Sequence, residues 1–211
     1  MSGKHYMVVP LRWDRIISRT AEAEANIQDW LPQVYAAAQA NHKPLYVFAH
    51  SWGSVMTRHV LAELAAKGSP VHVDKYITLG SPLVPANLAV KEFDQLELGN
   101  AKEDYGESVR KPANVTLWTN FWAKRDVFSN AIPAADVNYR VDDDADRYQE
   151  LLHAAIKALK NPFKALKDLR NLKNFSIWHF AYMLGYHQTF PAINVQLDLD
   201  IPNADIAPNA F

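Results

Sequence analysis

The feature that most constrains the fold is an apolar run that ends in a serine and passes directly into a helical pattern. Residues Leu45–Ala49 are continuously apolar and of strand length, which is typical of a strand buried on both faces of a parallel sheet. Beyond Ser51 a mostly apolar set of residues recurs at helical spacing, which predicts a helix. Gly68 is placed to end that helix. The members of this helical stripe are Val55, Met56, His59, Val60 and Leu64.

The residues around Ser51 have the spacing of a nucleophile elbow, small-x-Ser-x-Gly, with Ala49 and Gly53 at the small positions. Small residues are expected there because the turn is tight and the strand and helix backbones approach closely. Such a turn lifts the serine hydroxyl above the sheet edge and directs the helix N-terminus toward a developing oxyanion. The alternative interpretation is an ordinary strand–turn–helix in which Ser51 caps the helix.

The rest of the chain alternates strand-like and helical patterns, which indicates βαβ units and a parallel sheet. A helix is expected over Ser18–Gln39, with a kink or a boundary at Pro32. No linker divides the chain, so we expect one domain over 1–211. Within it, residues of about 142–175 are expected to form a helical lid or insertion, or else ordinary helices with a solvated outer face. The expected strands are Tyr6–Val9, Leu45–Ala49, Val71–Leu79, Val115–Trp122 and Val137–Val141.

Composition excludes several classes of function. The 22 basic and 23 acidic residues give a formal net charge of −1, so no nucleic-acid partner is expected. The absence of cysteine excludes disulfides, thiolate metal sites and a cysteine nucleophile. No metal or cofactor is expected, because no histidine pair has HExxH spacing and the acidic residues near 142–146 suit helix capping better than calcium. No transmembrane segment or signal peptide is evident, so the prediction is a cytoplasmic protein.

A nucleophilic serine needs an acid and a base, which in this kind of fold follow it in the order Asp, His. Asp126 comes directly after the strand Val115–Trp122, where the acid is expected; Asp104 and Asp136 are alternatives, and Asp126 could instead pair with Arg125 on the surface. Of the eight histidines, five precede the acid and His153 lies on the polar side of a helical pattern. His179 is therefore the expected base, with His187 as the second candidate.

Four segments together resemble successive landmarks of the lipase-like α/β-hydrolase family: Ala49–Gly53, Ile77–Leu83, Asn120–Val127 and His179-x-x-Tyr182. The resemblance runs from about Leu45 to Tyr186. It implies a three-layer α/β sandwich with a mostly parallel central sheet and a small helical insertion before the histidine. It also implies a Ser51–His179–Asp126 triad, in which Ser51 attacks an acyl carbonyl, His179 moves the proton and Asp126 fixes its tautomer, with the Trp52 N–H as an oxyanion donor.

The sequence departs from that family before the serine. A second oxyanion donor usually comes from a His-Gly segment after an earlier strand, and this sequence has none. Only 50 residues precede Ser51, so we expect a shortened N-terminal part. Either the loop Pro10–Asp14 supplies the donor or that part of the usual fold is lacking.

These observations predict a serine esterase or lipase that acts through an acyl-enzyme on a small-molecule or lipid ester. The expected acyl pocket includes Leu11, Trp122 and Trp178. The alternatives are a non-catalytic hydrolase-fold binding protein, or a thioesterase or acyltransferase with the same triad. A strictly alternating strand at Ile193–Ile201 is expected to close a sheet edge or to pair with a second copy in a homodimer.

Overall fold

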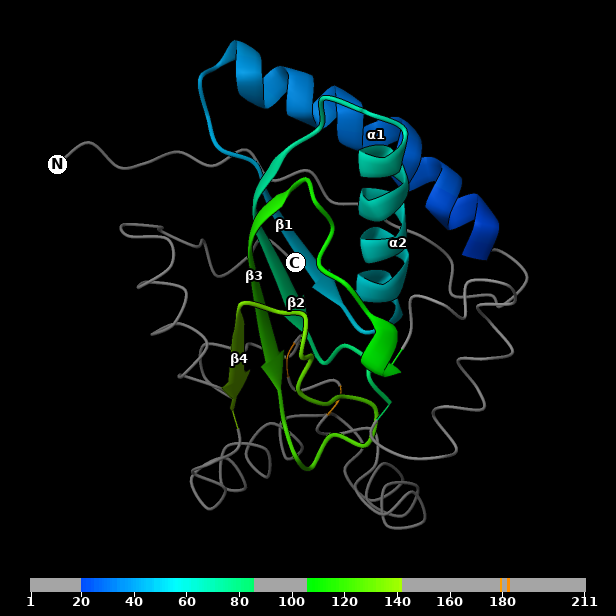
Figure 1. Cartoon of the computed structure of the whole chain (residues 1–211), viewed down its shortest axis with the longest axis vertical. Helices are drawn as coiled ribbons and strands as arrows, with labels where there is room; N and C mark the ends of the chain where they lie inside the picture. The colour runs from blue at the N-terminus through cyan, green and yellow to red at the C-terminus, as the bar shows by residue number, and fades with distance from the viewer. Residues whose placement is uncertain (1–19, 86–105, 142–178, 180–181, 183–211) are drawn as a thin grey trace, which may run out of the picture.

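The computed structural model describes residues 20–85 and 106–141, together with His179 and Tyr182 (Figure 1). An all-parallel sheet and two α-helices make up most of this part of the chain. Its elements in chain order are α1 (Thr20–Ala40), β1 (Tyr46–His50), α2 (Trp52–Ala66), β2 (Val73–Leu79), the short 3₁₀ helix η3 (Gly106–Ser108), β3 (Val115–Trp122) and β4 (Val137–Arg140).

The four strands pair in the order β1-β2-β3-β4, and every pairing is parallel. All four carboxyl ends therefore lie at the same edge of the sheet, where open α/β sheets place their ligand sites. The turns after β1, β2 and β3 all leave from that edge. Segments that are far apart in the sequence, namely Ser51, Gly80–Ser81 and Asp126, are brought together in this way.

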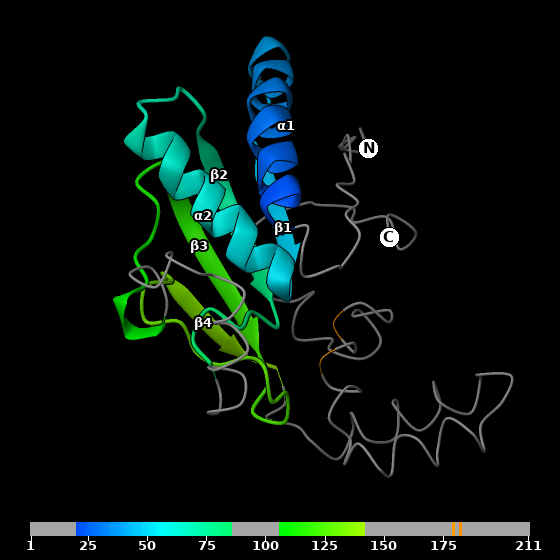
Figure 2. The same ribbon diagram turned by 90° about the vertical axis from the view of Figure 1, so that its right-hand side faces the viewer.

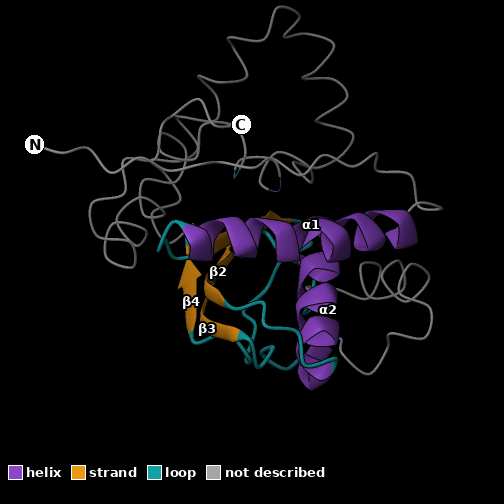
Figure 3. Cartoon of the chain, turned by 90° about the horizontal axis from the view of Figure 1, so that it is seen from above, coloured by secondary structure: helices purple, strands orange, loops and turns teal. Residues whose placement is uncertain are grey.

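The helices α1 and α2 cover one face of the sheet and cross each other, as Figures 2 and 3 show. The helix α2 packs against β1 and α1 packs against α2. Their buried side chains join those of the sheet in one apolar core, which burial removes from water. Members of this core from each layer include Ile27 and Leu31 of α1, Val60 and Leu61 of α2, and Tyr76 and Trp118 of the sheet.

The C-terminus of α2 is closed by a glycine in the left-handed conformation, as expected from the sequence. The cap residue is Lys67, and Gly68 follows with a φ of +69°. The Gly68 N–H donates to the Ala65 carbonyl and the Ser69 N–H donates to the Leu64 carbonyl. This is the Schellman arrangement, which satisfies carbonyls that the helix itself leaves unpaired.

The predicted α/β fold with a parallel sheet is confirmed. Strands β1 to β4 each begin within two residues of the predicted position. Two local expectations are wrong. Of the two alternatives at Pro32, the boundary is wrong, because α1 continues through this residue, and the kink stays a prediction. Burial of β1 on both faces is also wrong, because Phe48 is 41% exposed on this strand, which is the outermost one of the described sheet.

Other expectations lie outside the described residues: the strand Tyr6–Val9, the helical insertion at 142–175 and the strand Ile193–Ile201. Within the described ranges, no helix is both long and apolar enough to cross a bilayer.

Candidate active site

Ser51 occupies the sharp turn between β1 and α2. Its φ is +53° and its ψ is −133°, a backbone conformation that non-glycine residues adopt only when the surrounding structure imposes it. The Ser51 N–H donates to the Leu79 carbonyl at 3.0 Å, which ties the turn to the end of β2. Ser51 occupies the N-cap position of α2, but its side chain makes no capping hydrogen bond, so its hydroxyl is not used to cap the helix.

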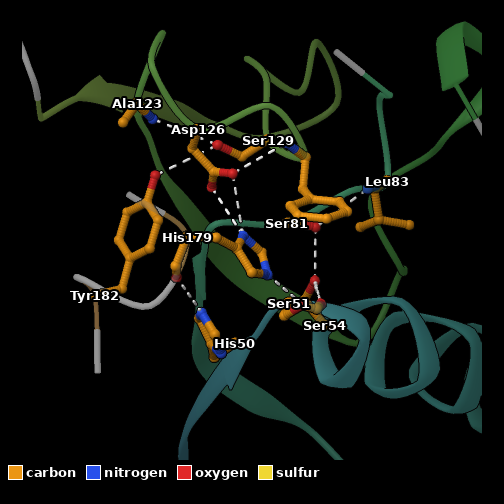
Figure 4. A network of polar contacts seen from close by, with 11 residues as sticks. His50, Ser51, Ser54, Ser81, Leu83, Ala123, Asp126, Ser129, His179 and Tyr182 are labelled. Carbon is orange, nitrogen blue, oxygen red and sulfur yellow. Dashed lines mark hydrogen bonds and ion pairs between the residues drawn. The ribbon is translucent and has the colours of Figure 1, made fainter. Parts of the chain in front are cut away.

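A buried group of hydroxyls supports this turn from below. Ser54 Oγ lies 2.6 Å from the Ser51 carbonyl oxygen and 2.6 Å from Ser81 Oγ (Figure 4). The Tyr76 hydroxyl donates to the Ser54 carbonyl at 2.6 Å. Burial raises the pKa of Tyr76, so this hydroxyl keeps its proton and stays a donor. Strands β1 and β2 and helix α2 are thus joined by polar contacts directly under Ser51.

His179 connects Ser51 to Asp126. Its Nε2 lies 2.6 Å from Ser51 Oγ, and its Nδ1 lies 3.0 Å from Asp126 Oδ2 and 3.1 Å from Oδ1 (Figure 4). The His179 and Asp126 side chains are 3% and 0% exposed. The Phe128 ring packs on the imidazole with ring centroids 4.6 Å apart. The structure therefore brings together the three residues that the sequence nominated as acid, base and nucleophile.

Asp126 is held by the loop that follows β3. Its backbone N–H donates to the Ala123 carbonyl at 3.0 Å, and its Oδ1 accepts the Phe128 N–H at 3.0 Å. A carboxylate that accepts a backbone N–H two residues further on stabilises a local turn of its own chain. This turn holds the carboxylate within hydrogen-bond distance of His179. The alternative of a surface aspartate paired to Arg125 is wrong, because Asp126 is buried.

A row of polar side chains across the sheet anchors the same loop. Thr78 of β2, Asn120 of β3 and Asn138 of β4 are register partners. Thr78 Oγ1 donates to Asn120 Oδ1 at 2.9 Å, and Asn120 Nδ2 donates to Asn138 Oδ1 at 2.9 Å and to the Asn130 carbonyl at 3.0 Å. Asn138 in turn pairs with the backbone N–H and carbonyl of Ile132. The amides of both asparagines thus tie residues 130–132 to the sheet.

Gly80, at the end of β2, is the position where close approach requires glycine. Its φ is +58°, and a Cβ there would lie 2.8 Å from Tyr182 Cε2 and 3.2 Å from Asp126 Oδ2. The expectation that Gly53 is needed for the same reason is wrong, since a Cβ at Gly53 would meet no described atom within 4 Å. The tight contact in this site lies between the strand ends, where the Tyr182 ring is fully buried, and not between β1 and α2.

The alternative acid Asp136 has different partners. Its carboxylate accepts Lys111 Nζ at 2.7 Å and the Trp118 N–H at 2.7 Å. Burial alone would raise the Asp136 pKa, but these two hydrogen bonds outweigh it and lower the pKa. Asp136 is thus a structural carboxylate that fixes the start of β4 to β3.

The remaining predicted residues are divided between described and undescribed parts of the chain. Trp52 is buried at the first position of α2, so its backbone N–H lies at the N-terminus of that helix. Trp122 is half-buried at the end of β3, with the Arg140 guanidinium 5.9 Å from its ring centroid. Leu11, Trp178, Asp104, His153 and His187 lie outside the described residues.

No group of three histidine, cysteine, aspartate or glutamate side chains in the described ranges is arranged to hold a metal ion. The chemistry that these residues can perform is proton transfer and nucleophilic attack by a serine.

Comparison with known proteins adds one match. A protein-family model described as alpha/beta hydrolase matches residues 10–104, which include β1, the Ser51 turn, α2 and β2. No curated protein and no solved structure matches the chain. This family match covers 95 of the 211 residues and agrees with the all-parallel sheet and the strand–turn–helix around Ser51, so it supports an assignment to the alpha/beta hydrolases.

Proposed function

We propose that this protein is a serine hydrolase that cleaves carboxylic esters through Ser51, His179 and Asp126. The observation that carries the proposal is the continuous buried chain of contacts from Asp126 through His179 to Ser51 Oγ. A hydrogen-bonded serine, histidine and carboxylate in this order is the arrangement that activates a serine for acyl transfer.

The contacts support the His179 tautomer that carries its proton on Nδ1. The ionised Asp126 carboxylate only accepts, so it binds Nδ1–H of His179, and the bare Nε2 then accepts the Ser51 hydroxyl proton. As that proton moves to Nε2, Ser51 Oγ bonds to the ester carbonyl carbon and the carbonyl oxygen becomes an oxyanion. His179 then protonates the leaving alkoxide, which leaves an acyl-enzyme. Water attacks the acyl-enzyme by the same proton transfers in reverse, releasing the acid and restoring Ser51.

The oxyanion is assigned to the N-terminus of α2. The Trp52 N–H is the first donor there, and the partial positive charge of the helix N-terminus adds to it. A second donor from Pro10–Asp14 stays a prediction. Loss of one such donor typically costs about 10²–10³ in kcat, so one donor alone would leave a slow enzyme and not an inactive one.

The direct test is labelling with a fluorophosphonate, which reacts with activated serines. We expect the wild-type protein to be labelled and Ser51→Ala not to be. The matched control is Ser69→Ala, which removes a serine hydroxyl just beyond α2 that accepts a hydrogen bond from the Val71 N–H. An unlabelled wild type would instead support a non-catalytic binding protein, and labelling that survives Ser51→Ala would overturn the assignment of the nucleophile.

The substrate class is tested separately. Hydrolysis of p-nitrophenyl esters of increasing acyl length separates an esterase, which prefers short chains, from a lipase. Matched thioesters in the same assay test the alternative of a thioesterase.

A further inference from the structure

His50 is the last residue of β1 and directly precedes Ser51 in the chain. Its Nε2 lies 2.9 Å from the backbone carbonyl oxygen of His179 (Figure 4). A carbonyl oxygen only accepts, so His50 donates this hydrogen bond from Nε2. Sequence reasoning set His50 aside because it precedes the acid in the chain, but its contact is with the backbone of the base.

Two consecutive residues thus bind the same histidine in two different ways. Ser51 Oγ meets the His179 side chain at Nε2, and His50 meets the His179 backbone at its carbonyl. The His50 and His179 rings also pack together, with centroids 5.0 Å apart and planes tilted by 36°. The His50 ring lies 6.0 Å from the Tyr182 ring, so it contacts both described residues of that segment.

We infer that His50 is a positioning residue, which holds the His179 backbone in register with the serine turn through its Nε2–H. This inference rests on the proposed function. Contacts at Nδ1 and Nε2 fix the angle of the imidazole ring, but the distance from Nε2 to Ser51 Oγ also depends on where the His179 backbone lies. Because His50 and Ser51 share a peptide bond, a hydrogen bond from one sets the position of the base relative to the other. Misplacement of a reacting group by about 1 Å costs on the order of 10²-fold in rate.

The donor can be moved by one bond without removing it. In glutamine, the amide nitrogen is as many bonds from Cβ as Nε2 is in histidine, whereas in asparagine it corresponds to Nδ1. We therefore expect His50→Asn to lower the fluorophosphonate labelling rate and kcat by about 10- to 100-fold with little change in KM, and His50→Gln to restore most of that loss.

The matched control is His72→Asn. His72 lies just before β2, at the opposite edge of the sheet, and its Nε2 is 2.7 Å from Thr116 Oγ1. We expect this variant to react at the wild-type rate. Equal rates in wild type, His50→Asn and His50→Gln would overturn the inference. Equal losses in both His50 variants would also overturn it, because they would show that the ring and not its Nε2–H is required.

A second measurement does not depend on activity. The Nδ1 proton of His179, bound to Asp126, is expected as a slowly exchanging downfield proton resonance. We expect His50→Asn to broaden or shift it and His50→Gln to preserve it. If the wild type is not labelled by the fluorophosphonate, the proposed function fails, and this resonance still tests the positioning role. An unchanged resonance in His50→Asn would overturn that role by itself.

Discussion

Two histidine–carboxylate pairs in the described residues have nearly the same distance between nitrogen and oxygen but different surroundings. His179 Nδ1 lies 3.0 Å from Asp126 Oδ2, with the side chains 3% and 0% exposed. His59 Nδ1 lies 2.9 Å from Glu24 Oε1 between α2 and α1, with the side chains 28% and 23% exposed. The distance alone does not distinguish them.

The difference is in what the second ring nitrogen meets. His179 Nε2 faces the Ser51 hydroxyl, a group that can give a proton. His59 Nε2 lies 3.6 Å from a second carboxylate, that of Glu63. A ring between two acids is favoured as a cation, while a ring between an acid and a hydroxyl can act as a base. The third partner and the burial, more than the histidine–acid contact, distinguish the proposed catalytic pair from the structural one.

The largest effect is expected when the carboxylates are neutralised. Asp126→Asn leaves His179 without its ionised acceptor and favours the wrong tautomer, and we expect kcat for ester hydrolysis to fall by about 10⁴. Glu24→Gln makes the same chemical change in the other pair and is expected to leave kcat unchanged. Steady-state kinetics of the two purified variants decide the matter. Comparable losses in both variants would show that the two histidine–carboxylate pairs do not differ in function.

A smaller effect is expected from crowding the edge of the sheet next to Asp126. Gly80→Ala places a Cβ against Tyr182 and Asp126 at a positive φ. We expect about 1–2 kcal/mol of destabilisation from the backbone and about 1–3 kcal/mol more from the crowding, together with slower labelling of Ser51. Gly68→Ala also has a positive φ but no described neighbour within 4 Å, so only the backbone cost of about 1–2 kcal/mol is expected. Urea unfolding that gives equal losses for the two variants would show that the contact with Tyr182 is unimportant.

The smallest effect is expected from the helix pair and depends on pH. The hydrogen bond with Glu24 raises the His59 pKa above its usual 6.5, against the opposing effect of burial, and the charges of Glu24 and Glu63 raise it further. A histidine whose pKa is raised in the folded state stabilises the fold fully at pH values below its pKa in the unfolded chain. This stabilisation is lost as the pH rises through the pKa of the folded state. We expect His59→Gln to lower the melting temperature more at about pH 6 than at about pH 9. A difference independent of pH would mean that the His59 charge contributes nothing.

Local patterns in the sequence predicted the strands, the helices and the three residues of the candidate site. The strand and helix periods, the serine spacing and the chain order of acid and base led to Ser51, Asp126 and His179, which the structure brings together. The errors at Phe48 and Gly53 share a cause, because each assumed a neighbour that only the packed structure could supply.

The residues that sequence reasoning missed depend on contacts between segments that are far apart in the sequence. Ser54 reaches Ser81 across 27 positions, and His50 reaches His179 across 129. Nothing in either local segment indicates its partner, because only the packing of the folded chain decides which side chains meet. The requirement for glycine at position 80 could not be read from the sequence, since the ring beside it comes from Tyr182.

The row formed by Thr78, Asn120 and Asn138 has a consequence for how the sheet assembles. These side chains satisfy one another only when the three strands are aligned as they are here. A slip of one residue in β3 would turn Asn120 to the other face of the sheet, and the buried Thr78 would lose its acceptor. An apolar row would tolerate such a slip far better. The row therefore favours the native strand register over registers shifted by one residue. In a shifted register Asp126, which follows β3, would be displaced from His179.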